Sequence, residues 1–229
     1  MQRRSLLAAV PLALLLTSGC SAFEDAVPPQ EAIDTAEAAF VDAGSVAFDL
    51  KQSAIPKGRN GVSAANGNGV IDKDTPKFRG QVTGVINGNS AGVEIIAVDD
   101  ETWMSFFTKD FNPVNMADLG APNPAEFFRT GSGVDSILAS TTDLKEGEAV
   151  RNGDTVLQEY TGVVPAEEVV RLFGLGESET EFDVEYGIEP ESGQVRSVVI
   201  AGNFYEEKET TFTLEITDYG KAVDITAPE

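Results

Sequence analysis

Residues 195–216 read VRSVVIAGNFYEEKETTFTLEI, and this stretch decides the class of fold. Apolar residues dominate from Val195 to Ala201, and they alternate with polar residues from Thr211 to Ile216, as expected for two β-strands. Acidic residues lie between the two runs and indicate a turn. Because strands that follow one another through a short turn are usually neighbours, the stretch predicts an antiparallel pair.

The same kind of pattern continues on both sides of this pair. Further strands are predicted at residues 46–51, 70–74, 78–86, 93–98, 102–107, 148–150, 156–163, 182–186 and 223–225. Residues 55–69 are rich in Gly, Asn and Ser, and we predict a long hairpin connection there.

Short helices are predicted at four places, because apolar residues recur there at helical spacing. They cover residues 31–43, 125–129, 134–140 and 165–173. Gly44 follows the first of them, where a C-cap glycine is expected. The sequence therefore predicts one α+β domain, in which a large antiparallel sheet has one face covered by a few short helices.

The N-terminus has the organisation of a bacterial export signal. Arg3 and Arg4 precede an apolar run from Leu6 to Leu16, and Cys20 follows a short stretch of small residues. The apolar run is too short to span a bilayer, which needs roughly 20 residues. The pattern resembles a lipobox, in which the thiol receives a diacylglyceryl group after cleavage of the bond before it.

This reading divides the chain into three parts. A lipoprotein signal peptide is predicted over residues 1–19, a lipidated N-terminus and tether over residues 20–30, and the folded domain over residues 31–229. The alternative is an ordinary secreted protein whose single thiol, Cys20, stays unmodified. The leucine-rich run favours general secretory export over the twin-arginine route, and both would deliver the same product.

Charge and composition exclude several classes of function. From Cys20 onward the chain has 14 basic and 38 acidic residues, a net charge of −24, so it should be repelled by nucleic acids and by anionic headgroups. The acidic residues are expected to form a solvated surface, with an acidic binding site as the alternative. Histidine is absent, which excludes catalytic sites built on imidazole and zinc sites that need histidine.

No motif in the sequence predicts catalysis, a metal site or a cofactor. Residues 64–75 have the spacing of a calcium-binding loop, but Ala64 and Thr75 occupy the two positions that need carboxylates. Residues 99–101, Asp-Asp-Glu, are better explained as an exposed turn than as paired catalytic carboxylates. We therefore expect a protein that is not an enzyme.

Large apolar side chains are concentrated around the middle of the chain. A filled core and a hollow one would produce the same pattern, and the sequence leaves both open. The candidates for lining a ligand cavity are Trp103, Phe106, Phe127, Phe128, Ile137, Leu138, Val169, Leu172 and Phe173.

Several segments together resemble the actinobacterial LppX/LprG lipoproteins, the LppX_LprAFG family. The resemblance rests on residues 120–128 with 133–138, on residues 162–169, on residues 219–228 and on the lipobox that ends at Cys20. It implies a curved antiparallel β half-barrel with short helices on its concave face, enclosing an apolar cavity.

The resemblance also implies a function, which composition alone does not. Such a protein would bind the acyl chains of a glycolipid, lipoglycan or phospholipid and carry the lipid within the cell envelope. It would be anchored at the extracytoplasmic face of the cell membrane, with a membrane exporter as a further partner. The alternatives are an envelope scaffold or sensor with a filled core and, less expected, an enzyme that acts through carboxylates alone.

Overall fold

The structure is a computed structural model that describes residues 27–228 apart from residues 87, 108, 177–179 and 206–207. The predicted signal peptide, the predicted acylation site Cys20 and most of the predicted tether lie outside the described residues. Within the described part, no helix combines the length and the apolar character that crossing a membrane requires.

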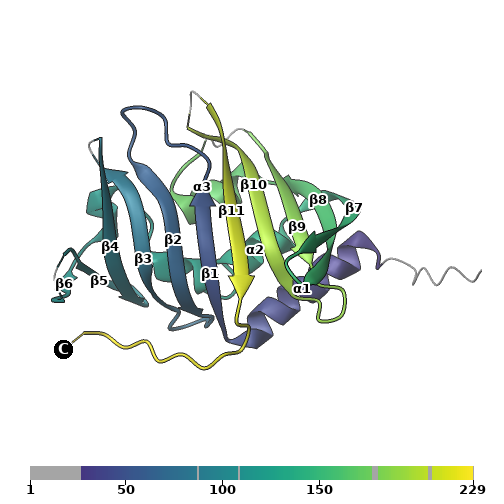
Figure 1. Ribbon diagram of the computed structural model, residues 1–229, viewed down its shortest axis with the longest axis horizontal. Coiled ribbons are helices and arrows are strands. Elements are labelled where there is room, and N and C mark those ends of the chain that lie inside the picture. Colours follow the sequence, from purple (N-terminus) through teal and green to yellow (C-terminus); the bar gives the residue numbers. More distant parts are fainter. Residues whose placement is uncertain (1–26, 87, 108, 177–179, 206–207, 229) are drawn as a thin grey trace, which may run out of the picture.

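Eleven strands of the described chain form one antiparallel sheet (Figure 1). They are β1 (Ser45–Gln52), β2 (Gly61–Val70), β3 (Lys77–Ile86), β4 (Asn89–Val98), β5 (Glu101–Ser105), β6 (Asn112–Pro113), β7 (Thr142–Asn152), β8 (Thr155–Val164), β9 (Phe182–Ile188), β10 (Val195–Tyr205) and β11 (Lys208–Thr217). Their order is β6-β5-β4-β3-β2-β1-β11-β10-β9-β8-β7. The first and last strands are therefore paired in the middle, and each half of the sheet is built from sequential neighbours.

Short helices lie on one face of the curved sheet, behind the strands in Figure 1. They are α1 (Pro29–Ala43), the 3-10 helices η1 (Met116–Leu119) and η2 (Pro124–Phe128), α2 (Val134–Ala139) and α3 (Ala166–Phe173). Buried residues from the helices and from the inner face of the sheet form one hydrophobic cluster. The predicted α+β class and half-barrel are confirmed, and the shared cluster indicates that this part of the chain folds as a unit.

The helix α1 shows how local sequence positions an element on the sheet. It begins at Pro29, two residues before the predicted start, with proline in its first turn, where a missing N–H costs nothing. It ends at Gly44, whose φ of 66° is the left-handed conformation that glycine adopts freely, and whose N–H donates to the Val41 carbonyl. The predicted C-cap is confirmed, and Ile33 and Phe40 are on the buried face of the helix.

The predicted hairpin connection over residues 55–69 is wrong, because most of it belongs to strand β2. Turn-forming residues indicated a loop, but here glycine makes room for close packing. A Cβ on Gly69 would lie 2.2 Å from the Phe128 ring, which packs against this strand. A side chain at Gly69 would displace that ring, so a glycine-rich segment is compatible with a strand.

Two other predicted strands do not form as expected. Residues 70–74 leave the sheet after Val70, because they form a turn. The Asp72 carboxylate closes this turn by accepting hydrogen bonds from the backbone N–H groups of Asp74 and Thr75, both at 2.8 Å. Residues 223–225 lie beyond β11 without joining the sheet, although Ile225 is buried and its carbonyl accepts a hydrogen bond from Lys77.

Strand ends also differ from the predictions at two places. β5 ends at Ser105, so residues 106 and 107 are outside the sheet. β7 begins at Thr142, well before the predicted start at residue 148. It is an exposed edge strand with two register shifts and many charged residues, features that protect a sheet edge from pairing with other chains.

Candidate functional site

An apolar cavity of about 240 Å³ lies between the concave face of the sheet and the helices. The sheet contributes side chains from β1, β2, β3, β4, β5, β9, β10 and β11, and the opposite wall comes from α1, η1, η2, α2, α3 and the segments beside them. Among the described residues that line the cavity, none is charged, and only Asn60 and Tyr186 have polar side chains. The cavity is therefore suited to hydrocarbon.

Six of the nine predicted cavity residues do line this space. They are Phe127 and Phe128 of η2, Ile137 and Leu138 of α2, and Leu172 and Phe173 of α3. The helical spacing places them on the faces that point at the sheet. That they contact a ligand stays a prediction.

The structure places the other three predicted residues elsewhere. Trp103 lies beside Met104 on β5, and it is Met104 that lines the cavity, because successive side chains of a strand point to opposite faces. Phe106 follows the end of β5 and is 49% exposed. Val169 is fully buried in the core and does not border the cavity.

Most of the sheet side of the cavity was missed by sequence reasoning. Its residues include Val46, Phe48 and Leu50 of β1 and Phe212, Leu214 and Ile216 of β11. Each set occupies every second position of its strand, so the period-two pattern contained the signal. What the pattern could not tell was which strand faces border a space and which are packed against helices.

Aromatic rings contribute much of the cavity surface. Phe48, Phe78 and Phe128 form a cluster in which the Phe48 ring centroid is 5.7 Å from that of Phe78 and 5.6 Å from that of Phe128. A second group is centred on Phe173, whose ring centroid is 5.0 Å from that of Phe212. All three pairs are tilted, which avoids the unfavourable face-to-face stacking of aromatic rings. They stabilise a rigid apolar wall at both places.

The phenol of Tyr186 lines the cavity, and its surroundings keep it neutral. The side chain is fully buried, and its hydroxyl lies 2.7 Å from the Thr141 hydroxyl. Burial raises the pKa of Tyr186 well above its ordinary value, because the phenolate would lose its hydration. The group therefore stays protonated and hydrogen-bonded, and it adds no charge to the cavity.

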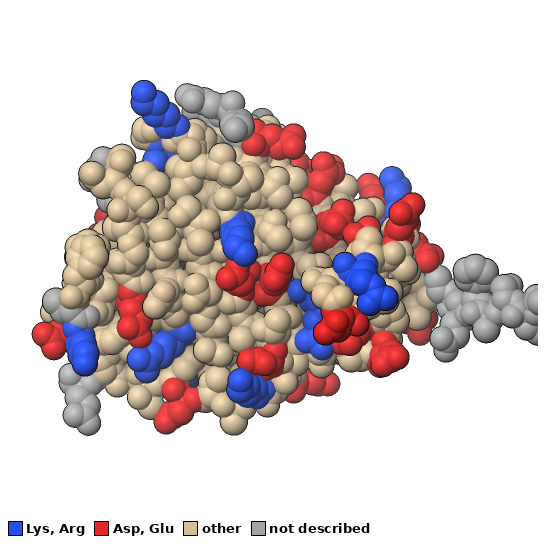
Figure 2. Space-filling model, in the orientation of Figure 1, with Lys and Arg blue, Asp and Glu red and all other residues tan. Residues whose placement is uncertain are grey.

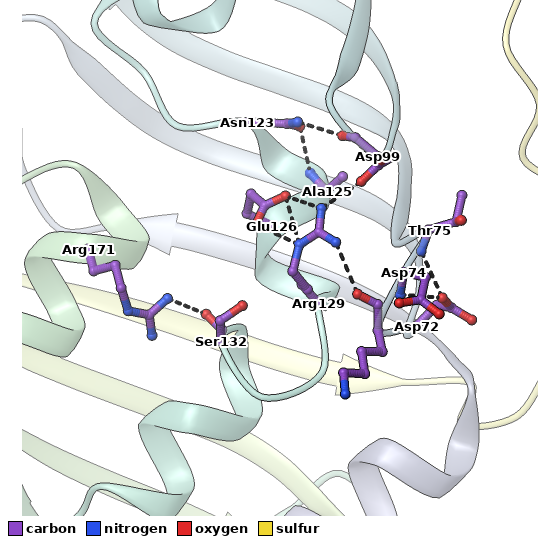
Figure 3. A network of polar contacts seen from close by, with 11 residues as sticks. Asp72, Asp74, Thr75, Asp99, Asn123, Ala125, Glu126, Arg129, Ser132 and Arg171 are labelled. Atoms are coloured by element: carbon purple, nitrogen blue, oxygen red, sulfur yellow. Dashed lines mark hydrogen bonds and ion pairs between the residues drawn. The ribbon is translucent and has the colours of Figure 1, made fainter.

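Arg129 holds η2 in position, in the network of Figure 3. Its guanidinium donates to the Glu126 carboxylate at 2.7 and 2.9 Å and to Asp99 Oδ1 at 2.7 Å. It also donates to the Lys73 carbonyl at 3.0 Å. Hydrogen bonds to Glu126 and then to Asp99 raise the pKa of Arg129, so the side chain stays charged. The network joins the helix with Phe127 and Phe128 to two connections between strands.

Two further contacts fix the same wall of the cavity. The Asn123 side chain accepts from the Ala125 N–H at 3.0 Å, as a helix N-cap, and donates to the Asp99 carbonyl at 2.7 Å. Arg171 of α3 donates to the Ser132 carbonyl, just before α2, which links the two helices. The helix predicted over residues 125–129 begins one residue earlier, at Pro124.

Comparison with known proteins places this architecture in a family. The model of the LppX_LprAFG lipoproteins matches residues 28–225. The chain belongs to the LppX_LprAFG family. The resemblance seen in the sequence is thereby confirmed, and comparison with curated protein sequences finds no significant match.

Two solved structures show the same LppX_LprAFG fold. LprF from Mycobacterium bovis is 10% identical and superposes with a TM-score of 0.73, covering 87% of this chain and 96% of LprF. LppX from Mycobacterium tuberculosis is 14% identical, with a TM-score of 0.59 and coverage of 86% of this chain and 97% of LppX. At such identities the likeness concerns the fold.

The acidic turn considered in the sequence has a structural role in this LppX_LprAFG protein. Asp99, one of the three acidic residues considered in the sequence, lies at the β4–β5 turn and pairs with Arg129. No group of three or more acidic, cysteine or histidine side chains in the described ranges could hold a metal ion. The cavity thus remains the candidate site.

We expect Arg129→Gln to lower the free energy of unfolding by about 2 kcal/mol, because hydrogen bonds to charged groups stabilise by roughly that amount when partly shielded. The Arg129 side chain is 21% exposed, whereas Arg79, paired with Glu94, is 52% exposed. Arg79→Gln is therefore the matched control and should cost about 0.5 kcal/mol. Urea denaturation measures both, and equal losses would contradict a special role for the Arg129 network.

Proposed function

We propose that this LppX_LprAFG lipoprotein binds the acyl chains of an envelope lipid in its apolar cavity and carries that lipid within the cell envelope. The observation that supports the proposal is a cavity of about 240 Å³ with no charged residue among its described lining. Burial of hydrocarbon is favourable by about 0.8 kcal/mol per methylene, so affinity needs no ionic contact. The cavity also exceeds the roughly 150 Å³ of an engineered apolar cavity that takes up benzene.

The same observation weighs against the two alternative functions. A scaffold or sensor with a filled core would have no reason to keep an open apolar space, since empty volume costs stability. An enzyme acting through carboxylates would need two acidic side chains facing a shared cleft. The lining of the cavity supports a binding protein that is not an enzyme.

The remaining parts of the proposal concern place and partners. We place the protein at the extracytoplasmic face of the cell membrane, held by acylation of Cys20. The ligand is an acylated glycolipid or a phospholipid, and a membrane exporter is a further candidate partner. The acidic composition supports solubility of the domain in the aqueous space between membranes.

Mass spectrometry of lipid released from the protein purified from its native membranes would test the proposal. We expect an acylated lipid in near-stoichiometric amount, and its headgroup would distinguish glycolipid from phospholipid. The delipidated protein should bind a fluorescent fatty acid in solution. Protein that is empty as isolated and that also fails to bind the fatty acid would contradict the proposal.

A further inference from the structure

Exposed apolar side chains are concentrated at one end of the molecule. The described part of the chain exposes five large apolar residues, and three of them, Phe106, Phe107 and Leu119, belong to the stretch between the end of β5 and the end of η1. Single exposed apolar residues are common on protein surfaces, but a local group of them indicates a contact surface.

The two phenylalanines form a projecting aromatic pair. Their ring centroids are 4.2 Å apart in an edge-on arrangement, and Phe107 is 88% exposed. The φ angle of Phe107 is 56°, in a region that bulky residues rarely adopt. This backbone conformation costs free energy, and such strain is often found at functional sites. The pair is therefore held outward at a cost to the fold.

The aromatic pair is continuous with the mouth of the cavity. Met104, two residues before Phe106, lines the cavity, and Ser105 lies opposite Glu94, next to the lining residue Val93. Leu119 lines the cavity and is itself 38% exposed. The exposed pair therefore directly follows a strand that lines the cavity, and the cavity reaches the surface at Leu119.

Charge around this mouth differs from charge elsewhere on the protein. Residues 60–71, 80–93 and 102–108, on the neighbouring strands β2 to β5 and their connections, include no charged residue. In Figure 2 the upper part of the outer face over β2 to β4 is correspondingly tan, whereas acidic side chains gather over the other half of the sheet. This uncharged corner, formed by the named segments of β2 to β5, is the part of the acidic protein that negatively charged phosphates repel least.

Basic side chains border the same corner. Lys57 and Arg59 precede Asn60, which lines the cavity, and Lys109 follows the aromatic pair. All three are exposed, and none forms a salt bridge with the residues that the structure describes. Lys57 and Arg59 lie next to the cavity lining in the chain and Lys109 lies next to the aromatic pair, so these cations are placed to contact lipid phosphates above an apolar interior.

We infer that this mouth rim, formed by Phe106, Phe107 and Leu119 with Lys57, Arg59 and Lys109, docks on the surface of a lipid bilayer. Aromatic rings favour the boundary between headgroups and acyl chains, and the cations would contact the phosphates. The inference rests on the proposed function, because docking would open the cavity toward the lipids of that surface.

The docking contact is distinct from the expected anchor. In Figure 1 strands β5 and β6 lie at the opposite end of the molecule from the beginning of α1, where the tether would join the domain. The anchor by itself therefore does not press the mouth rim against a membrane. Docking requires the surface chemistry of the rim.

Vesicle flotation of the unlipidated chain from Ser21 onward tests this inference. Vesicles of phosphatidylcholine with phosphatidylglycerol should carry the wild-type protein upward at physiological salt. The double substitution Phe106→Ser with Phe107→Asn should lower the partition coefficient at least tenfold, and asparagine tolerates the positive φ of position 107. The control is Val156→Ser, which removes an apolar side chain that is 47% exposed at the start of β8 and should change nothing.

Fatty-acid binding in solution separates this inference from the proposed function. The double variant should bind the fluorescent fatty acid as the wild type does, which would support docking as its specific defect. Loss of fatty-acid binding by the double variant, or flotation equal to that of the wild type, would overturn the docking inference. Wild-type protein that floats with vesicles but binds no fatty acid would support docking and refute the proposed function.

Discussion

Replacing Ala65 with phenylalanine should reduce the binding of acyl chains at least tenfold and leave the fold intact. Ala65 lines the cavity from β2, and its partners in the neighbouring strands, Leu50 and Val82, line it as well. A phenyl ring at this position would occupy space that hydrocarbon needs. Since the ring enters an open space and not a filled core, the change in the free energy of unfolding should be within about 1 kcal/mol.

The neighbouring residue Ala64 provides the matched control for this substitution. Ala64 is on the opposite face of β2 and does not border the cavity, because side chains of a strand alternate. Ala64→Phe adds the same group one residue away and should leave affinity for the fluorescent fatty acid within about twofold, as expected for a change outside the site. Equal affinity of Ala65→Phe and the wild type would show that the ligand binds elsewhere.

The class of fold was predictable because it depends on repeated local patterns. Alternation in β1 and in β11 requires half-buried strands, and helical spacing in α3 requires an amphipathic helix with one buried face. Caps also obey local rules, as Gly44 and Asn123 show. These features depend on interactions within a few residues, so a single sequence is enough to predict them.

The errors come from interactions between distant parts of the chain. Strand β2 was taken for a loop because the need for glycine arises from Phe128, which is nearly 60 positions away in the sequence. Six of the cavity residues on the helices were predicted, but Trp103 was chosen in place of Met104, since both are apolar and only packing shows which one faces inward. Whether packed apolar side chains leave a cavity depends on the whole domain, so no local sequence pattern predicts it.

Replacing Gly80 with alanine should be among the most destabilising small changes in the sheet. A Cβ on Gly80 of β3 would lie 2.1 Å from the Asn66 carbonyl oxygen of β2. The obstacle is backbone, so the two strands would have to separate at this point of their ladder. We expect a loss of about 3 kcal/mol in the free energy of unfolding, the upper part of the usual range for overpacking.

Gly92→Ala is the control that isolates this close approach from the general effect of adding a methyl group to a strand. Gly92 lies in β4 of the same sheet, and its Cβ would meet only the Thr83 hydroxyl, at 3.7 Å, an ordinary contact. Loss of glycine's freedom in the unfolded chain should make Gly92→Ala neutral or stabilising by up to about 1 kcal/mol. Urea unfolding of both variants measures the difference. Similar free energies of unfolding for the two variants would mean that β2 and β3 can separate without cost. In that case, a need for close strand packing beside the cavity would not explain the glycines of β2 and β3.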